Sequence, residues 1–103
     1  MNVHSWTSVD FAVIKMRCMS CFPTLLAKWL PDGKRVGCEW VAKNPTRQDR
    51  SAGSFKINMD TGRWSDFATG DRGGDPISLY AYLTGLKQVE AARELRNQLG
   101  GTM

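Results

Sequence analysis

The stretch GSFKINMDTGRWSDFATGDRGGD, residues 53–75, decides the fold. Apolar and polar side chains alternate over residues 55–59, which is the period of a half-buried strand. The turn-forming triplet at residues 60–62 follows, and a second short run with bulky apolar side chains covers residues 63–67. Two such runs joined by a glycine-containing turn predict a β-hairpin.

The chain before this hairpin predicts a further strand and a long loop. From Lys34 the period is again two, with Val36, Cys38 and Trp40 on one face. The hairpin and this strand together would make a three-stranded antiparallel sheet. Residues 42–53 (AKNPTRQDRSAG) are polar and aperiodic, so we expect a loop of about a dozen residues, a length that is often functional.

Helices are expected on both sides of the sheet in the sequence. Residues 10–30 carry a helical apolar period with Asp10 as a capping residue, and Pro23 predicts a break or kink near residues 20–22. Residues 1–8 show no period and are expected to form a flexible arm. After a glycine-rich loop, Asp75 and the proline that follows it begin a helix that ends at Gly85.

A final amphipathic helix is expected up to Leu99. The predicted fold class is therefore α+β, a small three-stranded antiparallel sheet packed with N-terminal and C-terminal helices, in a single domain of residues 1–103. The chain is 42% hydrophobic and 23% charged, as in soluble globular proteins. No apolar run approaches the ~20 residues that cross a bilayer, so we expect no membrane partner and a cytoplasmic location.

The charge is concentrated in one part of the chain. The net charge is +4, and residues 34–63 hold seven basic residues against three acidic ones. This segment therefore carries an excess equal to that of the whole protein. A basic segment of this kind favours anionic partners such as nucleic acid.

Three cysteines allow two interpretations. Cys18, Cys21 and Cys38, with His4, would offer three sulfurs and a nitrogen to a metal ion. Residues 18–21, however, continue a helical apolar period and contain no turn residue. Cysteine is also among the most frequently buried residues, so we favour core packing and keep the metal site as the alternative.

The order of strand, basic loop, hairpin, Gly-Gly-Asp loop and helices over residues 34–99 resembles the zinc-ribbon domain of phage- and plasmid-type DNA primases and primase-helicases. In that family the first strand carries a Cys-x-x-His pair, a Pro-Ser-Phe segment leads into the hairpin, and a Cys-x-x-Cys-Gly stretch precedes Gly-Gly-Asp. The corresponding segments here are residues 38–41, 53–55 and 66–70, before the glycines and aspartate at 73–75.

Three of the four ligand positions implied by this resemblance hold Val41, Asp66 and Thr69, and only Cys38 keeps the residue type of the family's ligand. A structural zinc site needs four donors of the thiolate or imidazole kind, so we expect neither a metal nor another cofactor. We expect an apolar cluster to hold this end of the ribbon instead. Its members would be Trp40, Phe55, Trp64 and Phe67.

The resemblance implies template recognition, so the expected function is that of a DNA-binding accessory module and not of an enzyme. The expected partners are single-stranded or primed DNA and a primase or helicase catalytic subunit. Cations of the loop and hairpin would neutralise phosphates, and an aromatic side chain would stack on bases. Trp64 or Phe67 could stack, although we expect Phe67 to be buried. The candidate contacts are Lys43, Arg47, Arg50, Lys56, Arg63, Trp64 and Arg72.

The alternative is a protein-interaction module or small mobile-element factor that binds or inhibits a replication or defence protein. An independent enzyme ranks last, because the glycine-rich loop lacks the phosphate-binding lysine and no nucleophile and base are paired. Asp66, Asp71 and Asp75 could suggest a divalent-cation site, but Asp75 is better explained as a helix cap.

Overall fold

The structure is a computed structural model that describes residues 10–99. The expectations for the arm of residues 1–8 and for His4 lie outside that range. Helices α2 (Phe11–Ser20) and α3 (Phe22–Trp29) form the N-terminal segment. The Asp10 carboxylate accepts a hydrogen bond from the Val13 amide at 3.1 Å, and the break falls at Cys21. Both the cap and the break were predicted.

The sheet is antiparallel and its five strands follow one another in chain order. They are β1 (Lys34–Val36), β2 (Glu39–Ala42), β3 (Phe55–Asn58), β4 (Trp64–Asp66) and β5 (Arg72–Gly73). The α+β class is as expected and the β3–β4 hairpin is confirmed, but the prediction of three strands is wrong.

Two turns account for the additional strands. The expected strand of residues 34–41 is a hairpin, because Gly37 takes a φ of 61° and lets the chain reverse, which places Val36 opposite Glu39. Strand β5 lies in the segment expected to be a flexible loop. The Asp66 amide donates to the Asp71 carbonyl at 2.8 Å, and Trp64 lies opposite Gly73.

Helices α4 (Pro76–Thr84) and α5 (Gln88–Gln98) complete the chain. The Asp75 carboxylate accepts from the Ser78 amide at 2.8 Å, which confirms the predicted cap. Gly85 ends α4 with a left-handed φ of 76°, a conformation that glycine adopts without strain. The carboxylate of Asp75 is therefore part of a helix start.

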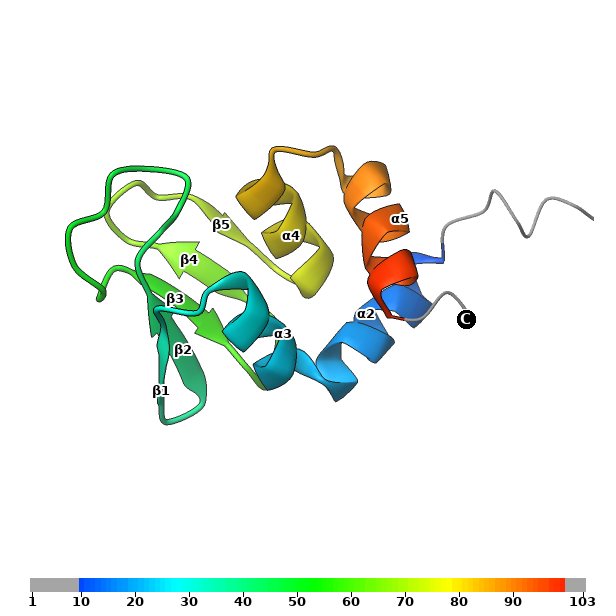
Figure 1. Cartoon of the computed structure of the whole chain (residues 1–103), viewed down its shortest axis with the longest axis horizontal. Coiled ribbons are helices and arrows are strands. Elements are labelled where there is room, and N and C mark those ends of the chain that lie inside the picture. The colour runs from blue at the N-terminus through cyan, green and yellow to red at the C-terminus, as the bar shows by residue number, and fades with distance from the viewer. Residues whose placement is uncertain (1–9, 100–103) are drawn as a thin grey trace, which may run out of the picture.

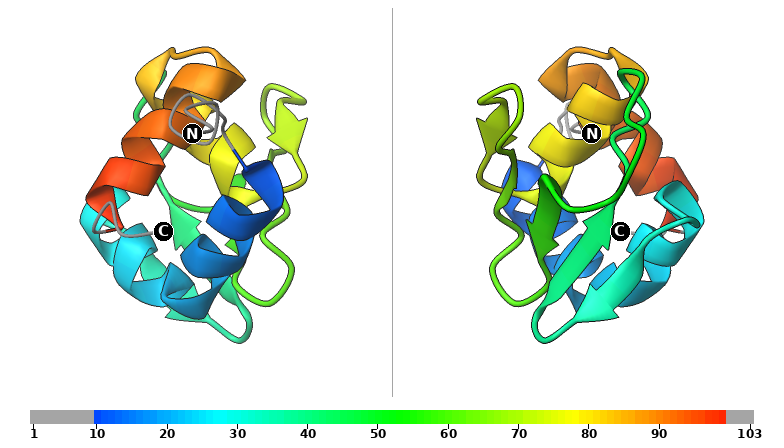
Figure 2. Two further views of the ribbon diagram at one scale, coloured as in Figure 1. Left: turned by 90° about the vertical axis from the view of Figure 1, so that its right-hand side faces the viewer. Right: turned by 90° about the vertical axis from the view of Figure 1, so that its left-hand side faces the viewer.

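The four helices of residues 10–99 lie on one side of the sheet, as Figure 1 shows. The side chains between the two layers form a continuous hydrophobic core that includes Phe22, Leu26, Phe55, Ile57 and Leu95. Burying a side chain of this size contributes about 1.5–3 kcal/mol. In the right-hand view of Figure 2, no described helix stands in front of the strands. We call this the open face of the sheet, although Val41 at its centre is buried.

The cysteines are spread over the fold. Cys18 is fully buried in the core, as expected, and burial raises the pKa of its thiol to about 12. Cys21 is half-buried against the same core, whereas Cys38 is exposed in the β1–β2 turn. Within the described range, every helix is too short or too polar to cross a bilayer.

Candidate nucleic-acid interface

A row of side chains crosses the open face of the sheet. Lys34 lies opposite Val41, Val41 opposite Lys56, Lys56 opposite Ser65, and Ser65 opposite Arg72. Directly paired residues of neighbouring strands point to the same face. Because Phe55 and Ile57 on β3 point into the core, the row must point away from it. Three of its five members are cations.

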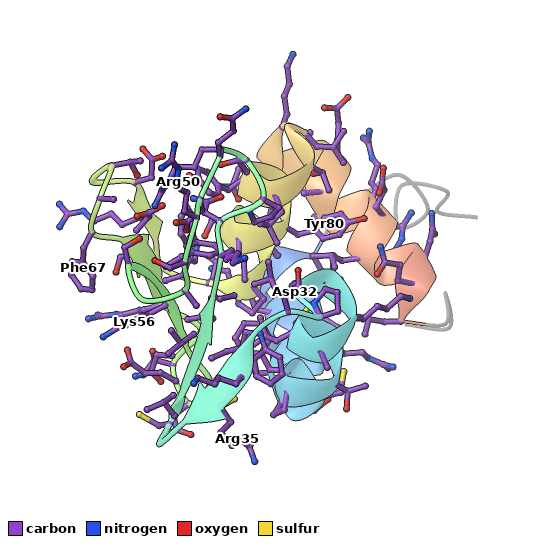
Figure 3. The ribbon with its side chains drawn as sticks, turned by 60° about the vertical axis from the view of Figure 1, so that its left-hand side comes forward. Asp32, Arg35, Arg50, Lys56, Phe67 and Tyr80 are labelled. Atoms are coloured by element: carbon purple, nitrogen blue, oxygen red, sulfur yellow. The ribbon has the colours of Figure 1, made fainter. Side chains whose placement is uncertain are left out.

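Phe67 stands beside this row. Its side chain is 73% exposed, and the Lys56 ammonium lies 5.9 Å from the centre of its ring. Figure 3 shows both side chains projecting from the outward side of the sheet. The expectation that Phe67 is buried is wrong. The chain alternates along β4, so Trp64 and Asp66 point inward and Phe67 points outward.

Trp64 has the opposite environment. It is 5% exposed, its ring lies 4.6 Å from that of Tyr82, and its indole Nε1 donates to the Ser78 hydroxyl at 2.9 Å. A base therefore has no access to its ring, and Trp64 is corrected from a stacking candidate to a core residue. Trp40 and Phe55 belong to the core as expected.

Three more of the candidate cations are exposed. Lys43 follows β2, Arg50 lies in the loop between β2 and β3, and Arg63 directly precedes β4. Figure 3 shows Arg50 near the outer end of that loop. None of the three side chains has a hydrogen bond or ion pair with another residue of the described range. They are therefore available to an anionic partner.

Arg47 is the exception among the predicted contacts. Its Nε donates to Asp66 Oδ2 at 2.8 Å, and its Nη2 donates to Asp66 Oδ1 at 3.2 Å and lies 3.3 Å from Asp49 Oδ2. Its side chain is 27% exposed, and that of Asp66 is fully buried. Arg47 is thus bound to two carboxylates and is not an open phosphate contact.

Asn44 extends the contacts of Asp66. Its Nδ2 donates to Asp66 Oδ2 and to the Tyr82 hydroxyl, each at 2.8 Å, and its Oδ1 accepts from the Thr46 amide at 2.9 Å. The Tyr82 hydroxyl in turn donates to Asp71 at 2.7 Å. These bonds fasten the long loop to β4 and to α4.

The pKa of the Asp66 carboxyl lies well below its usual range. Its hydrogen bond with Arg47 is the largest cause, and bonds from Asn44 and from the Ala68 amide act in the same direction, while burial opposes them. The carboxylate therefore stays ionised in the folded protein. A buried charge of this kind is tolerated because it is paired and hydrogen-bonded.

The ligand positions that the resemblance assigned do not come together. The Cys38 carbonyl accepts from the Met59 amide at 2.7 Å, just beyond one end of β3, whereas Asp66 lies opposite Phe55 at the other end. Among residues 10–99, no three side chains of histidine, cysteine, aspartate or glutamate gather as metal ligands would. The residues at these positions do not fit a zinc ion.

The chain matches no protein family model, and no curated protein or solved structure matches it. Sequence reasoning missed Lys34, and it placed Phe67 in the core. The period of two already separates Phe67 from Trp64, so that signal was present in the sequence. The position of Lys34 depended on recognising the turn at Gly37.

Proposed function

We propose that this protein is a DNA-binding accessory module that holds single-stranded DNA across the open face of its sheet. The observation that carries the proposal is the row of Lys34, Lys56 and Arg72 beside exposed Phe67, on a face that no described helix covers. Resemblance to the template-recognition domain of mobile-element primases supports the same function.

The arrangement combines the two contributions that single-strand binders use. Cations that neutralise phosphates release condensed counterions, which gives affinity without sequence preference. Exposed aromatic rings add base stacking, worth ~1–3 kcal/mol per base. Four strand spacings separate Lys34 from Arg72, so the row extends over about 19 Å. That length accommodates several nucleotides of an extended strand.

Phe67 favours an unpaired strand over a duplex. A base can stack on the phenyl ring only when it is free of its own neighbours, and in a duplex both faces of each base are occupied. The cations alone would bind either form. The proposed role is to present such a strand to a primase or helicase catalytic subunit in the cytoplasm.

A salt titration with matched charge variants tests this function. Lys56→Glu with Arg72→Glu changes the open face, and Lys28→Glu with Arg93→Glu makes the same change in net charge on exposed positions of α3 and α5. We expect the first pair to weaken binding of a single-stranded oligonucleotide about tenfold or more at low salt. The slope of log affinity against log salt should fall by about 0.7 for each lost contact.

The control pair should bind nearly as the parent does. Equal losses in both pairs would show that net charge alone attracts the DNA, and the proposed face would be rejected. The same conclusion follows if the parent does not bind single-stranded DNA even at low salt. Tighter binding of duplex than of single strands would reject the role given to Phe67.

One observation favours the second candidate function, a protein-interaction module. Val36 is 52% exposed and Phe67 is 73% exposed, so the open face also offers apolar contacts. A protein partner held by these side chains would stay bound at high salt, whereas DNA would dissociate. Co-purification of a catalytic subunit with the parent but not with Phe67→Ala, at high salt, would favour this function.

A further inference from the structure

Two pairs of residues with the same spacing meet at the end of β4. Asn44 and Arg47 are three positions apart in the long loop, and both donate hydrogen bonds to Asp66. Asp66 and Thr69 are three positions apart at the end of the hairpin. The spacings are those of the Cys-x-x-His and Cys-x-x-Cys pairs of the primase zinc ribbons.

The segment from Asp66 to Gly70 forms a tight turn around the Asp66 side chain. The amides of Thr69 and Gly70 donate to the Asp66 carbonyl at 3.3 and 2.8 Å, and the Ala68 amide donates to Asp66 Oδ1 at 2.9 Å. Gly70 closes the turn with a φ of 83°. The Ala68 amide, which is directed at the anionic side chain, would equally stabilise a thiolate that binds zinc.

The residues that meet here cannot bind a metal together. The Arg47 guanidinium has no lone pair to donate, and it already neutralises the carboxylate of Asp66. The Asp66 carboxylate is the centre of the cluster, and the side chains of Arg47 and Asn44 both donate hydrogen bonds to it where metal ligands would otherwise meet. The three side chains make direct bonds across 19 and 22 positions of sequence.

We infer that the cluster of Asn44, Arg47 and Asp66 occupies the place of the ribbon's metal ion and does its structural work. The cluster joins the loop that carries Lys43 and Arg50 to the end of β4, so Arg47 is a positioning residue. This structural role is independent of DNA binding. The first ligand pair is then residues 44 and 47 and not residues 38 and 41.

The experiment restores the ligands at the inferred positions. One variant carries Asn44→Cys, Arg47→His, Asp66→Cys and Thr69→Cys. We expect it to bind one Zn²⁺ per chain, measured by metal analysis after dialysis and by competition with a chromogenic chelator. With zinc it should unfold cooperatively, and chelation should lower its melting temperature strongly because ligand binding is then part of folding. The melting temperature of the parent should not respond to the chelator.

A control variant offers the same ligand types in the other alignment. It keeps Cys38 and carries Val41→His, Asp66→Cys and Thr69→Cys, so it also has three cysteines and one histidine at the positions in question. We expect no stoichiometric zinc, because Cys38 and Asp66 lie at opposite ends of β3. Equal zinc binding by both variants, or none by the first, would overturn the inference.

A second measurement uses the parent and needs no metal. Arg47→Met, Asp66→Leu and the double variant form a cycle, read as the equilibrium constant for unfolding in urea. Each single change leaves one charged partner behind, whereas the double change removes both. We expect the equilibrium constant for unfolding of the double variant to be at least tenfold smaller than multiplying the two single effects predicts. Simple multiplication of the two effects would contradict a shared structural role.

Discussion

The two faces of the sheet give the same residue types opposite roles. Trp64 begins β4 and Phe67 directly follows that strand, three positions later, yet Trp64 is packed under the helices and Phe67 projects from the open face. Arg47 and Lys56 are both cations of the basic segment, yet Arg47 is held by buried Asp66 and Lys56 stands beside Phe67. Strand parity and the presence of a buried partner, and not residue type, decide which side chains a ligand can reach.

The largest difference in stability should appear when Trp64 and Phe67 are each replaced by alanine. Trp64→Ala removes a buried ring and its bond to Ser78, so we expect it to lower the free energy of unfolding by about 4 kcal/mol. Phe67→Ala removes an exposed ring and should change that energy by no more than about 0.5 kcal/mol. Urea denaturation measures both. Similar losses for the two variants would contradict the assignment of faces.

Arg47 and Arg50 should also differ in their effect on stability, although less than Trp64 and Phe67 do. Arg47→Ala leaves the Asp66 carboxylate buried without its cation, and we expect a clear fall in melting temperature. Arg50→Ala, in the same loop, changes an exposed side chain without a described partner and should be nearly neutral. Thermal melting of the two variants decides the question. A neutral Arg47→Ala would show that the loop is held by other contacts.

Acid should lower the stability of the folded protein through Asp66, by less than the loss of Arg47 does. The pKa of Asp66 is depressed in the folded protein, so its contribution to stability is present above the unfolded pKa of about 3.9 and is lost as the pH falls below that value. Asp66→Asn has no carboxyl group at this position, so its stability does not include this pH-dependent contribution. The difference in urea midpoint between parent and Asp66→Asn should therefore narrow from pH 6 to pH 3. A constant difference would reject the ion-pair explanation.

The open face should respond in binding and not in stability. Phe67→Ala should weaken the binding of single-stranded DNA by about 1–2 kcal/mol, because stacking is lost. The slope of log affinity against log salt should stay unchanged, because no phosphate contact is lost. Phe67→Trp should retain the affinity, since any flat ring can stack. Fluorescence anisotropy of a labelled oligonucleotide measures both. A fall in the salt slope would indicate that the variant had disturbed Lys56 as well.

Local signals predicted much of this fold. The caps at Asp10 and Asp75, the break near Cys21 and the β3–β4 hairpin depend on residues close in sequence, and all are confirmed. The strand beginning at Lys34 was wrong, because alternation continues through a turn and does not reveal the reversal at Gly37.

The candidate interface was harder to predict than the fold. Lys43, Arg50, Arg63 and Arg72 are exposed and Lys56 is half-buried, but their role in binding stays a prediction. Arg47 could not be separated from these by composition or period. Its buried partner lies 19 positions away, and only the folded chain brings the two charges together.

Short strands at both margins of the sheet have a consequence for self-association. Margins with free backbone groups are templates on which another copy of a protein can add its own strand, and brevity and positive charge oppose such growth. Here one margin is β1, with Lys34 and Arg35 among its three residues, and the other is β5, with Arg72 in a strand of two. Both margins are therefore short and cationic, which opposes the addition of a strand from a second copy.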